Sequence, residues 1–356
     1  MEKLILENLS KSFQNVVPQL EKLKGSTILI TGGTGFVGSW VARALVWLND
    51  NFDFGCQIIL LARNPENLEQ SDSMLYRRSD ITYLRSDIRS VHNLPSHINY
   101  IIHAAANPDN RVHMSDPVNT MDVIALGTKA IMDAATRLAD IRSIVHISSG
   151  QVYGKAPDNG EALRETILYN FSKNDITSVY PEAKRYAETI CLAYRSLFKL
   201  PICIVRPFSF IGPYQKLNKP WAINTFLQEA LNNQPMRIVG NGKPQRSYLY
   251  ASDMAVWLLV VLAEGKSGDI YNLGSSEGVS LKEVTEKINK LLPHPLDVMI
   301  QNYNNNESKF IPNIEFITNK LNLEIVFGFN EALQQTIKWN IDNLKTRMEN
   351  GIDKSS

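Results

Sequence analysis

The sequence has few cysteines, no long apolar run and no histidine pairs at metal-binding spacing, and each of these shortages argues against a class of site or protein. Cys56, Cys191 and Cys203 lie far apart without a CxxC pair, which argues against a zinc site or a disulfide framework and fits a reducing compartment. The six histidines show no HxxxH or HxH spacing, so we expect no protein-held metal. The longest apolar run, Met254–Ala263, is about half of the ~20 residues that span a bilayer.

An excess of either charge is also missing. Lysine and arginine number 37 and aspartate and glutamate 36, which gives a formal net charge of +1. A dedicated nucleic-acid binder usually has a strong basic excess, so we expect no nucleic-acid partner and, from the short apolar runs, no membrane partner. The N-terminus carries early acids and no long apolar core, unlike a secretory signal, and we expect a cytoplasmic protein.

Short apolar runs alternate with helical stretches through the first part of the 356-residue chain. Strands are expected at Thr27–Thr31, Gln57–Ala62, Ile81–Arg85, Tyr100–His103, Ser143–Ser148 and Ile202–Arg206. Helices are expected between them, among others over Phe36–Leu48, Pro117–Leu138 and Pro181–Phe198. This alternation predicts an α/β fold with a parallel sheet that helices cover on both faces.

The rest of the chain predicts an arm and a second lobe. We divide the sequence into an N-terminal arm (1–24), a main domain (25–206, with 252–273 returning to it) and a smaller lobe (207–251 and 274–350). The arm reads as one short amphipathic helix for packing or oligomer contact. Later helices are expected at Ser252–Glu264, Leu281–Leu292 and Glu331–Leu344, and a loop at Asn302–Asn306.

A glycine-rich loop joins the first strand to its helix. The segment TGGTGFVG places Gly32, Gly35 and Gly38 in a GxxGxxG pattern. Glycines there allow a tight turn, a close approach of backbone N–H groups to a pyrophosphate, and close helix packing. Strand, loop and helix follow in the required order, so we predict a dinucleotide site at these glycines with Phe36 and Val37.

The end of the second strand bears on which dinucleotide is bound. An acid there would bond the adenosine ribose hydroxyls and favour NAD(H), but the sequence reads Leu61-Ala62-Arg63-Asn64. Arg63 can pair with a 2′-phosphate, stack on adenine or lie in solvent. We favour NADP(H) over NAD(H).

Two further strand ends are expected beside the cofactor. Asp87, with Ile88 after it, follows the third strand and is placed to accept a hydrogen bond from the adenine amino group. Small residues after the fourth strand let the backbone run along the cofactor, namely Ala104, Ala105 and Ala106. His103 before them is expected to be a core histidine.

A tyrosine and a lysine stand four residues apart in the segment YPEAK. On a helix the side chains of Tyr180 and Lys184 share a face. A neighbouring ammonium favours tyrosinate, so we expect a phenol pKa lowered from about 10 toward neutrality and a role in acid–base catalysis. Ser149, at the end of the fifth strand, is placed to bond the substrate oxygen that exchanges this proton.

The motifs TGGTGFVG, HAAA, SSGQVYG, YPEAK and RPFSFIGP, in this order, resemble the extended short-chain dehydrogenase/reductase family. The resemblance covers about residues 25–345 and is closest to the nucleotide-sugar epimerase/dehydratase branch. It implies a Rossmann-type doubly wound parallel sheet with a smaller C-terminal α/β lobe for a nucleoside-diphosphate sugar. It implies Tyr180 as catalytic base, Lys184 as its electrostatic partner and ribose ligand, and Ser149 as partner of the substrate hydroxyl.

The same resemblance extends to the sugar-nucleotide lobe. The segment GNGKPQRSY is similar to the family's GxGxxxR, which implies that Arg246 binds the diphosphate. Ser209 stands where the family commonly has a substrate-binding asparagine, and Pro207 is expected beside the cofactor. Asp253 is expected to cap the helix that follows.

Two departures from the family pattern bear on the reaction. The 4,6-dehydratases carry Asp-Glu where this chain has Gly150-Gln151, and UDP-glucuronate decarboxylases keep a glutamate at the second position. Gln151 is still expected beside the substrate. We therefore predict hydride transfer at C4, by a 4-epimerase or a 4-ketoreductase. A dehydratase or decarboxylase with a relocated acid, or a non-catalytic cofactor-binding protein, are the alternatives.

The resemblance also implies a homodimer. Members of the family often pair through two helices that border the cofactor domain, forming a four-helix contact. The corresponding helices here are those expected at Pro117–Leu138 and Pro181–Phe198.

Overall fold

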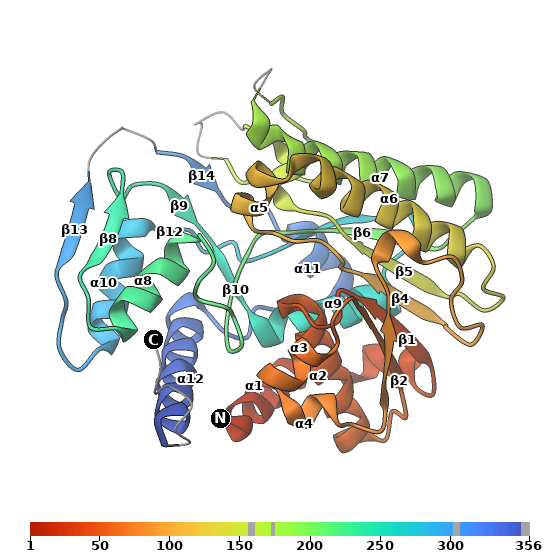
Figure 1. Cartoon of the computed structure of the whole chain (residues 1–356), viewed down its shortest axis with the longest axis horizontal. Coiled ribbons are helices and arrows are strands. Elements are labelled where there is room, and N and C mark those ends of the chain that lie inside the picture. Colours follow the sequence, from red (N-terminus) through yellow and green to blue (C-terminus); the bar gives the residue numbers. More distant parts are fainter. Residues whose placement is uncertain (156–160, 172–174, 302–306, 350–356) are drawn as a thin grey trace.

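A seven-stranded parallel sheet forms the centre of the molecule (Figure 1). The computed structural model describes residues 1–155, 161–171, 175–301 and 307–349, and the expected loop at 302–306 lies outside them. The strand order is β11-β6-β5-β4-β1-β2-β3. The bounds are β1 Thr27–Thr31, β2 Gln57–Ala62, β3 Ile81–Arg85, β4 Tyr100–His103, β5 Ser143–Ile147, β6 Ile202–Pro207 and β11 Ile270–Leu273. The six strands expected from apolar runs are confirmed to within one residue.

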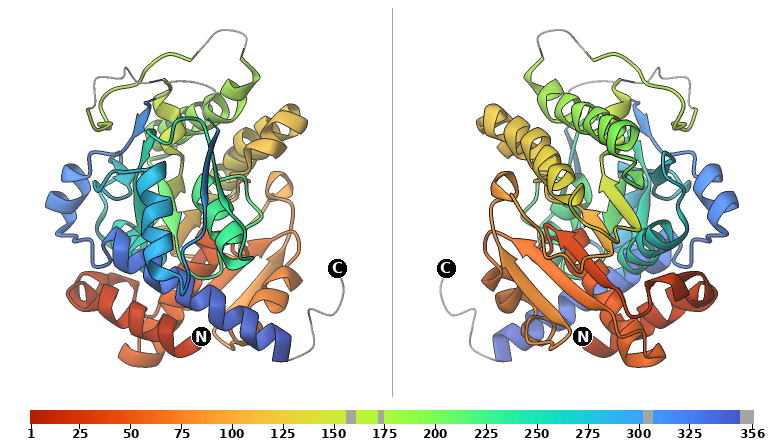
Figure 2. Two further views of the ribbon diagram at one scale, coloured as in Figure 1. Left: turned by 90° about the vertical axis from the view of Figure 1, so that its left-hand side faces the viewer. Right: turned by 90° about the vertical axis from the view of Figure 1, so that its right-hand side faces the viewer.

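Helices cover both faces of this sheet, as the near-continuous apolar strands predict. Helices α2 (Phe36–Phe52) and α9 (Ala251–Glu264) pack together on one face, and α6 (Pro117–Ala135) and α7 (Val179–Phe198) on the other (Figure 2). In β1, Ile28 and Ile30 enter the first core and Leu29 the second, because successive strand residues face opposite sides. The Rossmann-type doubly wound fold is thereby confirmed.

The C-terminal lobe is built from small sheets and three helices. The strands are β7 Ser209–Ile211 with β10 Tyr248–Tyr250, β8 Met236–Val239 with β13 Val298–Gln301, and β9 Gln245–Arg246 between β12 Val279–Ser280 and β14 Lys309–Phe310. The helices are α8 Ala222–Leu231, α10 Leu281–Leu291 and α12 Phe329–Glu349. Helix α10 starts at a capping box of Ser280 and Glu283, and its apolar residues join a core separate from those of the large sheet.

Shorter elements connect these layers. They are α3 Glu66–Ser71, α4 Ser73–Tyr76, α5 Asn110–Ser115 and α11 Glu315–Leu321, with 3₁₀ turns η2 Ile88–Ser90, η3 Gly150–Tyr153 and η4 Ile176–Ser178. Across the described ranges, no helix is both long and apolar enough to cross a membrane.

The prediction of one continuous helix in the N-terminal arm is wrong. Helix α1 (Glu2–Phe13) ends well before the 3₁₀ helix η1 (Val17–Leu23) begins. Pro18 stands in the first turn of η1, where its missing N–H costs nothing, whereas inside a continuous α-helix it would remove a hydrogen bond. The arm packs on α9, and Phe13 stacks on Trp47 of α2 with ring centroids 4.7 Å apart.

The prediction that Asp253 caps α9 is also wrong. No side-chain hydrogen bond caps this helix, whose N-cap residue is Tyr250. The buried Asp253 carboxylate instead accepts a hydrogen bond from the Ser12 hydroxyl at 2.6 Å and from the amides of Val326 and Phe327. It joins the arm, the main domain and the segment before α12, and its burial raises the pKa to about 6.

Candidate active site

The glycine loop after β1 is too crowded for side chains. Gly32 has a φ of +67°, and a Cβ atom there would lie 2.9 Å from the carbonyl oxygen of Ala104. A Cβ atom on Gly38 would lie 2.6 Å from the carbonyl oxygen of Gly32. The Thr31 hydroxyl accepts hydrogen bonds from the amides of Ala104 and Ala105, which holds the end of β4 beside the loop. The backbone therefore forms a cradle that only glycine permits.

Helix α2 begins directly at this cradle. Its N-cap residue is Gly35, and no described side chain caps the helix. The amides of the first turn, which includes Phe36 and Val37, therefore point toward the loop with the positive end of a 17-residue helix. This arrangement fits the pyrophosphate of a dinucleotide.

The charged residues at the two strand ends expected near adenosine differ in their hydrogen-bond partners. Arg63 is exposed at the end of β2. The Asp87 carboxylate already accepts three hydrogen bonds from Arg89, which hold its pKa at about 2. Ile88 is buried, and a Cβ atom on Gly127 of α6 would lie 2.7 Å from its side chain. Contact of Asp87 with adenine stays a prediction.

The core assignment of His103 is confirmed. Its Nδ1 lies 2.8 Å from the Thr31 hydroxyl and its Nε2 lies 3.1 Å from the Thr128 hydroxyl. Complete burial lowers its pKa to about 3, so the ring is neutral. The ring holds β4 against β1 and α6.

Tyr180 and Lys184 lie in the first turns of α7, and both side chains are buried. The Lys184 ammonium donates a hydrogen bond of 2.8 Å to the carbonyl oxygen of Ile147, at the end of β5. Its nitrogen lies 6.0 Å from the centroid of the Tyr180 ring. The shared helix face predicted from the YPEAK spacing is thus present.

The expected lowering of the Tyr180 pKa is not found. Burial raises the pKa of Tyr180 to about 12, and a hydrogen bond from Ser149 opposes this only in part. Burial lowers the pKa of Lys184 to about 8, with Glu188 acting in the other direction. The phenol is desolvated, and the ammonium is directed at a carbonyl, so burial outweighs the charge effect that spacing predicts.

Ser149 caps the 3₁₀ turn η3 and lies beside Tyr180. Its hydroxyl accepts a hydrogen bond of 3.1 Å from the amide of Gln151, whose side chain is exposed. A Cβ atom on Gly150 would lie 3.0 Å from the Phe310 ring and 3.1 Å from the Phe208 ring. A carboxylate at position 150 would therefore require these two rings to move.

A buried ion pair behind this site was missed from the sequence. Glu188 accepts a hydrogen bond of 2.5 Å from the Ser148 hydroxyl and pairs with Arg206 at 2.7 Å. Both charged side chains are almost inaccessible to solvent. Because Glu188 follows Lys184 by four residues on α7, their helical spacing was the available signal.

The residues predicted for the sugar nucleotide come from separate strands. Arg246 in β9 is half-buried and donates hydrogen bonds to the carbonyl oxygens of Gln245 and Ser308. Its guanidinium carbon lies 5.9 Å from the centroid of Phe310, the ring that packs over Gly150. Ser209 of β7 pairs with β10, and Pro207 ends β6. Phe310 thereby links Arg246 to the catalytic loop.

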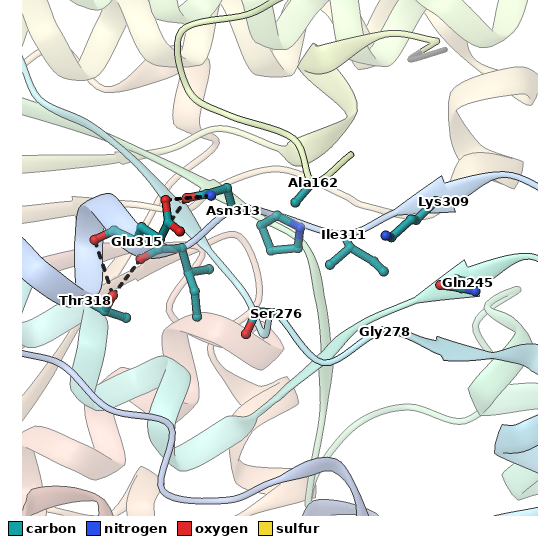
Figure 3. Close-up of a pocket in the computed structure, with 11 residues that line it drawn as sticks. Ala162, Gln245, Ser276, Gly278, Lys309, Ile311, Asn313, Glu315 and Thr318 are labelled. Atoms are coloured by element: carbon teal, nitrogen blue, oxygen red, sulfur yellow. Dashed lines mark hydrogen bonds between the residues drawn. The ribbon is translucent and has the colours of Figure 1, made fainter. Parts of the chain in front are cut away.

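A separate cavity of about 600 Å³ borders this small sheet (Figure 3). Its lining includes Gln245 and Lys309, the strand neighbours of Arg246 and Phe310. Since adjacent strand residues face opposite sides, the side chains of Arg246 and Phe310 are directed away from this cavity. It contains none of the predicted catalytic residues.

A buried carboxylate joins the two lobes. Asp109, in the loop between β4 and α5, accepts a hydrogen bond of 3.1 Å from the Lys219 ammonium of the C-terminal lobe. Arg111 also pairs with Asp109 and donates to the carbonyl oxygen of Asn218. Neither cation belongs to a motif that could be recognised from the sequence.

With this geometry in place, sequence comparison assigns the class. The chain belongs to the NAD dependent epimerase/dehydratase family, whose profile matches residues 28–274. It is therefore an enzyme of the extended short-chain dehydrogenase/reductase family. Its relatives are named as dehydratases, epimerases and decarboxylases.

Three similar proteins illustrate this range. The chain is 31% identical to the low-salt glycan biosynthesis protein Agl12 of Haloferax volcanii, over 73% of this chain and 81% of the relative. It is 28% identical, over 90% of its length, to the Arabidopsis thaliana trifunctional UDP-glucose 4,6-dehydratase/UDP-4-keto-6-deoxy-D-glucose 3,5-epimerase/UDP-4-keto-L-rhamnose-reductase RHM3, of which it spans 48%. The structure of dTDP-glucose 4,6-dehydratase from Bacillus anthracis in complex with NAD aligns with a TM-score of 0.75 at 24% identity, over 90% of this chain and 98% of that one.

Proposed function

We propose that the protein transfers hydride at C4 of a nucleoside-diphosphate sugar, as a 4-epimerase or a 4-ketoreductase, with Tyr180 as acid and base. The observation that carries this proposal is the combination of two features at the end of β5. Ser149, Tyr180 and Lys184 come together there, while the neighbouring positions hold Gly150 and Gln151.

The side chains of this site divide the chemistry between them. In oxidation, the Tyr180 oxygen removes the proton of the C4 hydroxyl, and in reduction it returns a proton to the C4 carbonyl oxygen. Ser149 holds the same oxygen by a hydrogen bond, and the Lys184 ammonium stabilises the tyrosinate. When bound, the nicotinamide accepts and returns the hydride. Burial of these groups strengthens their electrostatic interactions and keeps water away.

Gly150 argues against dehydration, and Gln151 argues against decarboxylation as well. Those reactions require an additional acid or base, and the space at position 150 is filled by Phe208 and Phe310. A relocated acid remains the second candidate, because relatives include a UDP-N-acetyl-alpha-D-glucosaminuronate decarboxylase and a dTDP-glucose 4,6-dehydratase.

NADP(H) is the proposed dinucleotide in preference to NAD(H). The exposed Arg63 at the end of β2 supports this choice, because a guanidinium can form charge-assisted hydrogen bonds with a 2′-phosphate. No acid stands in the Leu61-Ala62-Arg63-Asn64 segment to bond the ribose hydroxyls.

A homodimer through α6 and α7 is proposed as well. These helices lie side by side on the outside of the sheet (Figure 1). Each exposes apolar side chains, namely Val118, Met121 and Leu126 on α6 and Tyr186, Leu192 and Leu197 on α7. Sedimentation at micromolar concentration tests this, and a monomer would contradict it.

Turnover assays test the proposed function. The purified protein is incubated with NADPH and a 4-keto-6-deoxy nucleotide sugar, and separately with nucleotide hexoses and either oxidised dinucleotide. We expect NADPH oxidation in the first assay or C4 epimers in the second, and a loss of at least about 100-fold in Tyr180→Phe. If the protein instead forms a 4-keto sugar from a nucleotide hexose and does not oxidise NADPH, a dehydratase becomes the first candidate. Unchanged turnover in Tyr180→Phe would refute the role of Tyr180 as acid and base.

A further inference from the structure

An imidazole ring lies against the proposed catalytic tyrosine. His113 of α5 stacks on Tyr180 with ring centroids 4.1 Å apart and an angle of 6° between the planes. Each side chain belongs to a residue that is only 5% exposed. The imidazole is closer to the phenol ring than the Lys184 nitrogen is, at 6.0 Å. The motif spacing on α7 gives no sign of this partner, because α5 lies in a different part of the chain.

A hydrogen bond fixes the tautomer of this ring. Nε2 of His113 lies 2.6 Å from the carbonyl oxygen of Asn107, and a carbonyl oxygen only accepts, so Nε2 carries a proton. Nδ1 is therefore the nitrogen that gains or loses a proton. The Asn107 side chain in turn accepts from the amide of Asp109, which holds the loop before α5 in place.

The charged groups around His113 act in both directions. Asp109 and the Asn107 carbonyl favour the imidazolium, whereas burial and Lys184 disfavour it, and the net effect is a lowered pKa. Arg111 and Lys219 lie beyond, both bound to Asp109.

Other charged groups on the elements that pack against α5 have partners of their own, and Glu188 of α7 pairs with Arg206 of β6. Asp116 caps α6, Asp175 caps η4, and Glu182 of α7 pairs with Arg185. Tyr180 is the titratable side chain whose ring is in stacking contact with His113.

We propose that His113 is a positioning residue that holds the Tyr180 ring and, by binding a proton at Nδ1, stabilises the tyrosinate. A tyrosinate with an imidazolium and a tyrosine with a neutral imidazole contain the same number of protons, so they are two arrangements of one proton over the pair. The ring charge of a tyrosinate attracts a stacked cation more strongly than a neutral phenol does. This inference rests on the proposed role of Tyr180 as base.

The first test measures ionisation of Tyr180 without any sugar substrate. Tyrosinate absorbance is followed across pH with saturating NADP⁺, and each protein is compared with its own Tyr180→Phe derivative. We expect His113→Phe, which keeps a flat ring, to raise the apparent Tyr180 pKa by about 0.5 to 1 unit. An exposed histidine supplies the matched control, and His97→Phe should leave the titration unchanged. Superimposed titrations of wild type and His113→Phe would overturn the inference.

The second test needs no change at His113 and therefore covers the case in which that variant fails to fold. Binding linkage is reciprocal, so ionisation of Tyr180 must raise the pKa of His113. Histidine NMR titration with NADP⁺ should give a higher His113 pKa in wild type than in Tyr180→Phe. Equal values would overturn the inference. If Tyr180 does not ionise below about pH 10 with NADP⁺ bound, the proposed function of Tyr180 as the catalytic base is rejected, and not the role of His113.

Discussion

The two halves of the proposed active site are built differently. The dinucleotide half relies on backbone: glycines that cannot carry a Cβ atom, and the uncapped start of α2. The catalytic half relies on buried side chains from α5, α7 and the strand ends, including Tyr180, Lys184 and His113. The glycine loop and the start of α2 are consecutive residues, whereas the catalytic side chains are up to about 70 positions apart in sequence. This difference determines both what a substitution breaks and what the sequence reveals.

The largest effect is expected in the backbone half. A Cβ atom on Gly38 would lie 2.6 Å from the carbonyl oxygen of Gly32, so Gly38→Ala must displace the loop that receives the pyrophosphate. We expect dinucleotide affinity to fall by at least about 100-fold, as measured by calorimetry. At Gly328 the nearest atom is 3.9 Å from the corresponding Cβ position, so Gly328→Ala serves as control and should bind normally. Equal affinity of the two variants would show that the crowding does not shape the site.

In the side-chain half, the buried ion pair is expected to dominate stability. Glu188→Gln leaves the Arg206 guanidinium buried without its counter-charge. We expect a loss of about 3 to 5 kcal/mol in the free energy of unfolding, measured with urea. The exposed pair of Asp140 and Arg142 gives the comparison, and Asp140→Asn should cost less than about 1 kcal/mol. Similar losses from both would contradict the importance assigned to burial.

A smaller, pH-dependent effect is expected where the arm meets both lobes. The folded-state pKa of Asp253 is raised to about 6 from an ordinary value near 3.8, so the folded protein binds this proton more tightly than the unfolded chain. Between about pH 4 and 6 stability from this group therefore increases as pH falls, by at most about 3 kcal/mol. Urea unfolding of Asp253→Asn should lack this contribution, and the same pH dependence in both proteins would argue against the assignment.

The smallest effect concerns Arg63, the basic side chain proposed to contact the adenosine part of the dinucleotide. Arg63→Ala should lower the preference for NADP(H) over NAD(H) by about tenfold, because a single exposed charge contact is lost. Affinities for both dinucleotides, measured side by side, give this ratio. A ratio that does not change would leave Arg63 as a surface residue and remove the support for NADP(H).

Local pattern was enough to predict most of the large sheet. The six expected strands are runs of apolar residues, and burial on both faces gives such runs without polar alternation. The short β11 (Ile270–Leu273) was not predicted as a strand, because its place beside β6 depends on a long-range pairing. The arm was predicted as a single helix, although Pro18 within the segment was the sign of a break.

The site shows the same division. Consecutive motifs identified the glycine loop and the Tyr180–Lys184 pair. The spacing could not predict that burial would raise the Tyr180 pKa, since desolvation depends on everything packed around the ring. It also could not show His113, which reaches Tyr180 from another helix, nor the two phenylalanine rings over Gly150. Contacts between distant segments are set by the assembled fold.

The proposed reaction is tested most directly by the mass of its product. The protein is incubated in heavy water with a dinucleotide and candidate nucleotide sugars, and the products are analysed by mass spectrometry and NMR. Hydride transfer at C4 predicts either an epimer of unchanged mass or an alcohol formed from a 4-ketone. Neither product should carry solvent deuterium on a carbon atom, and Tyr180→Phe should form neither product. A product that has lost water or carbon dioxide, with deuterium on a ring or methyl carbon, would contradict the account.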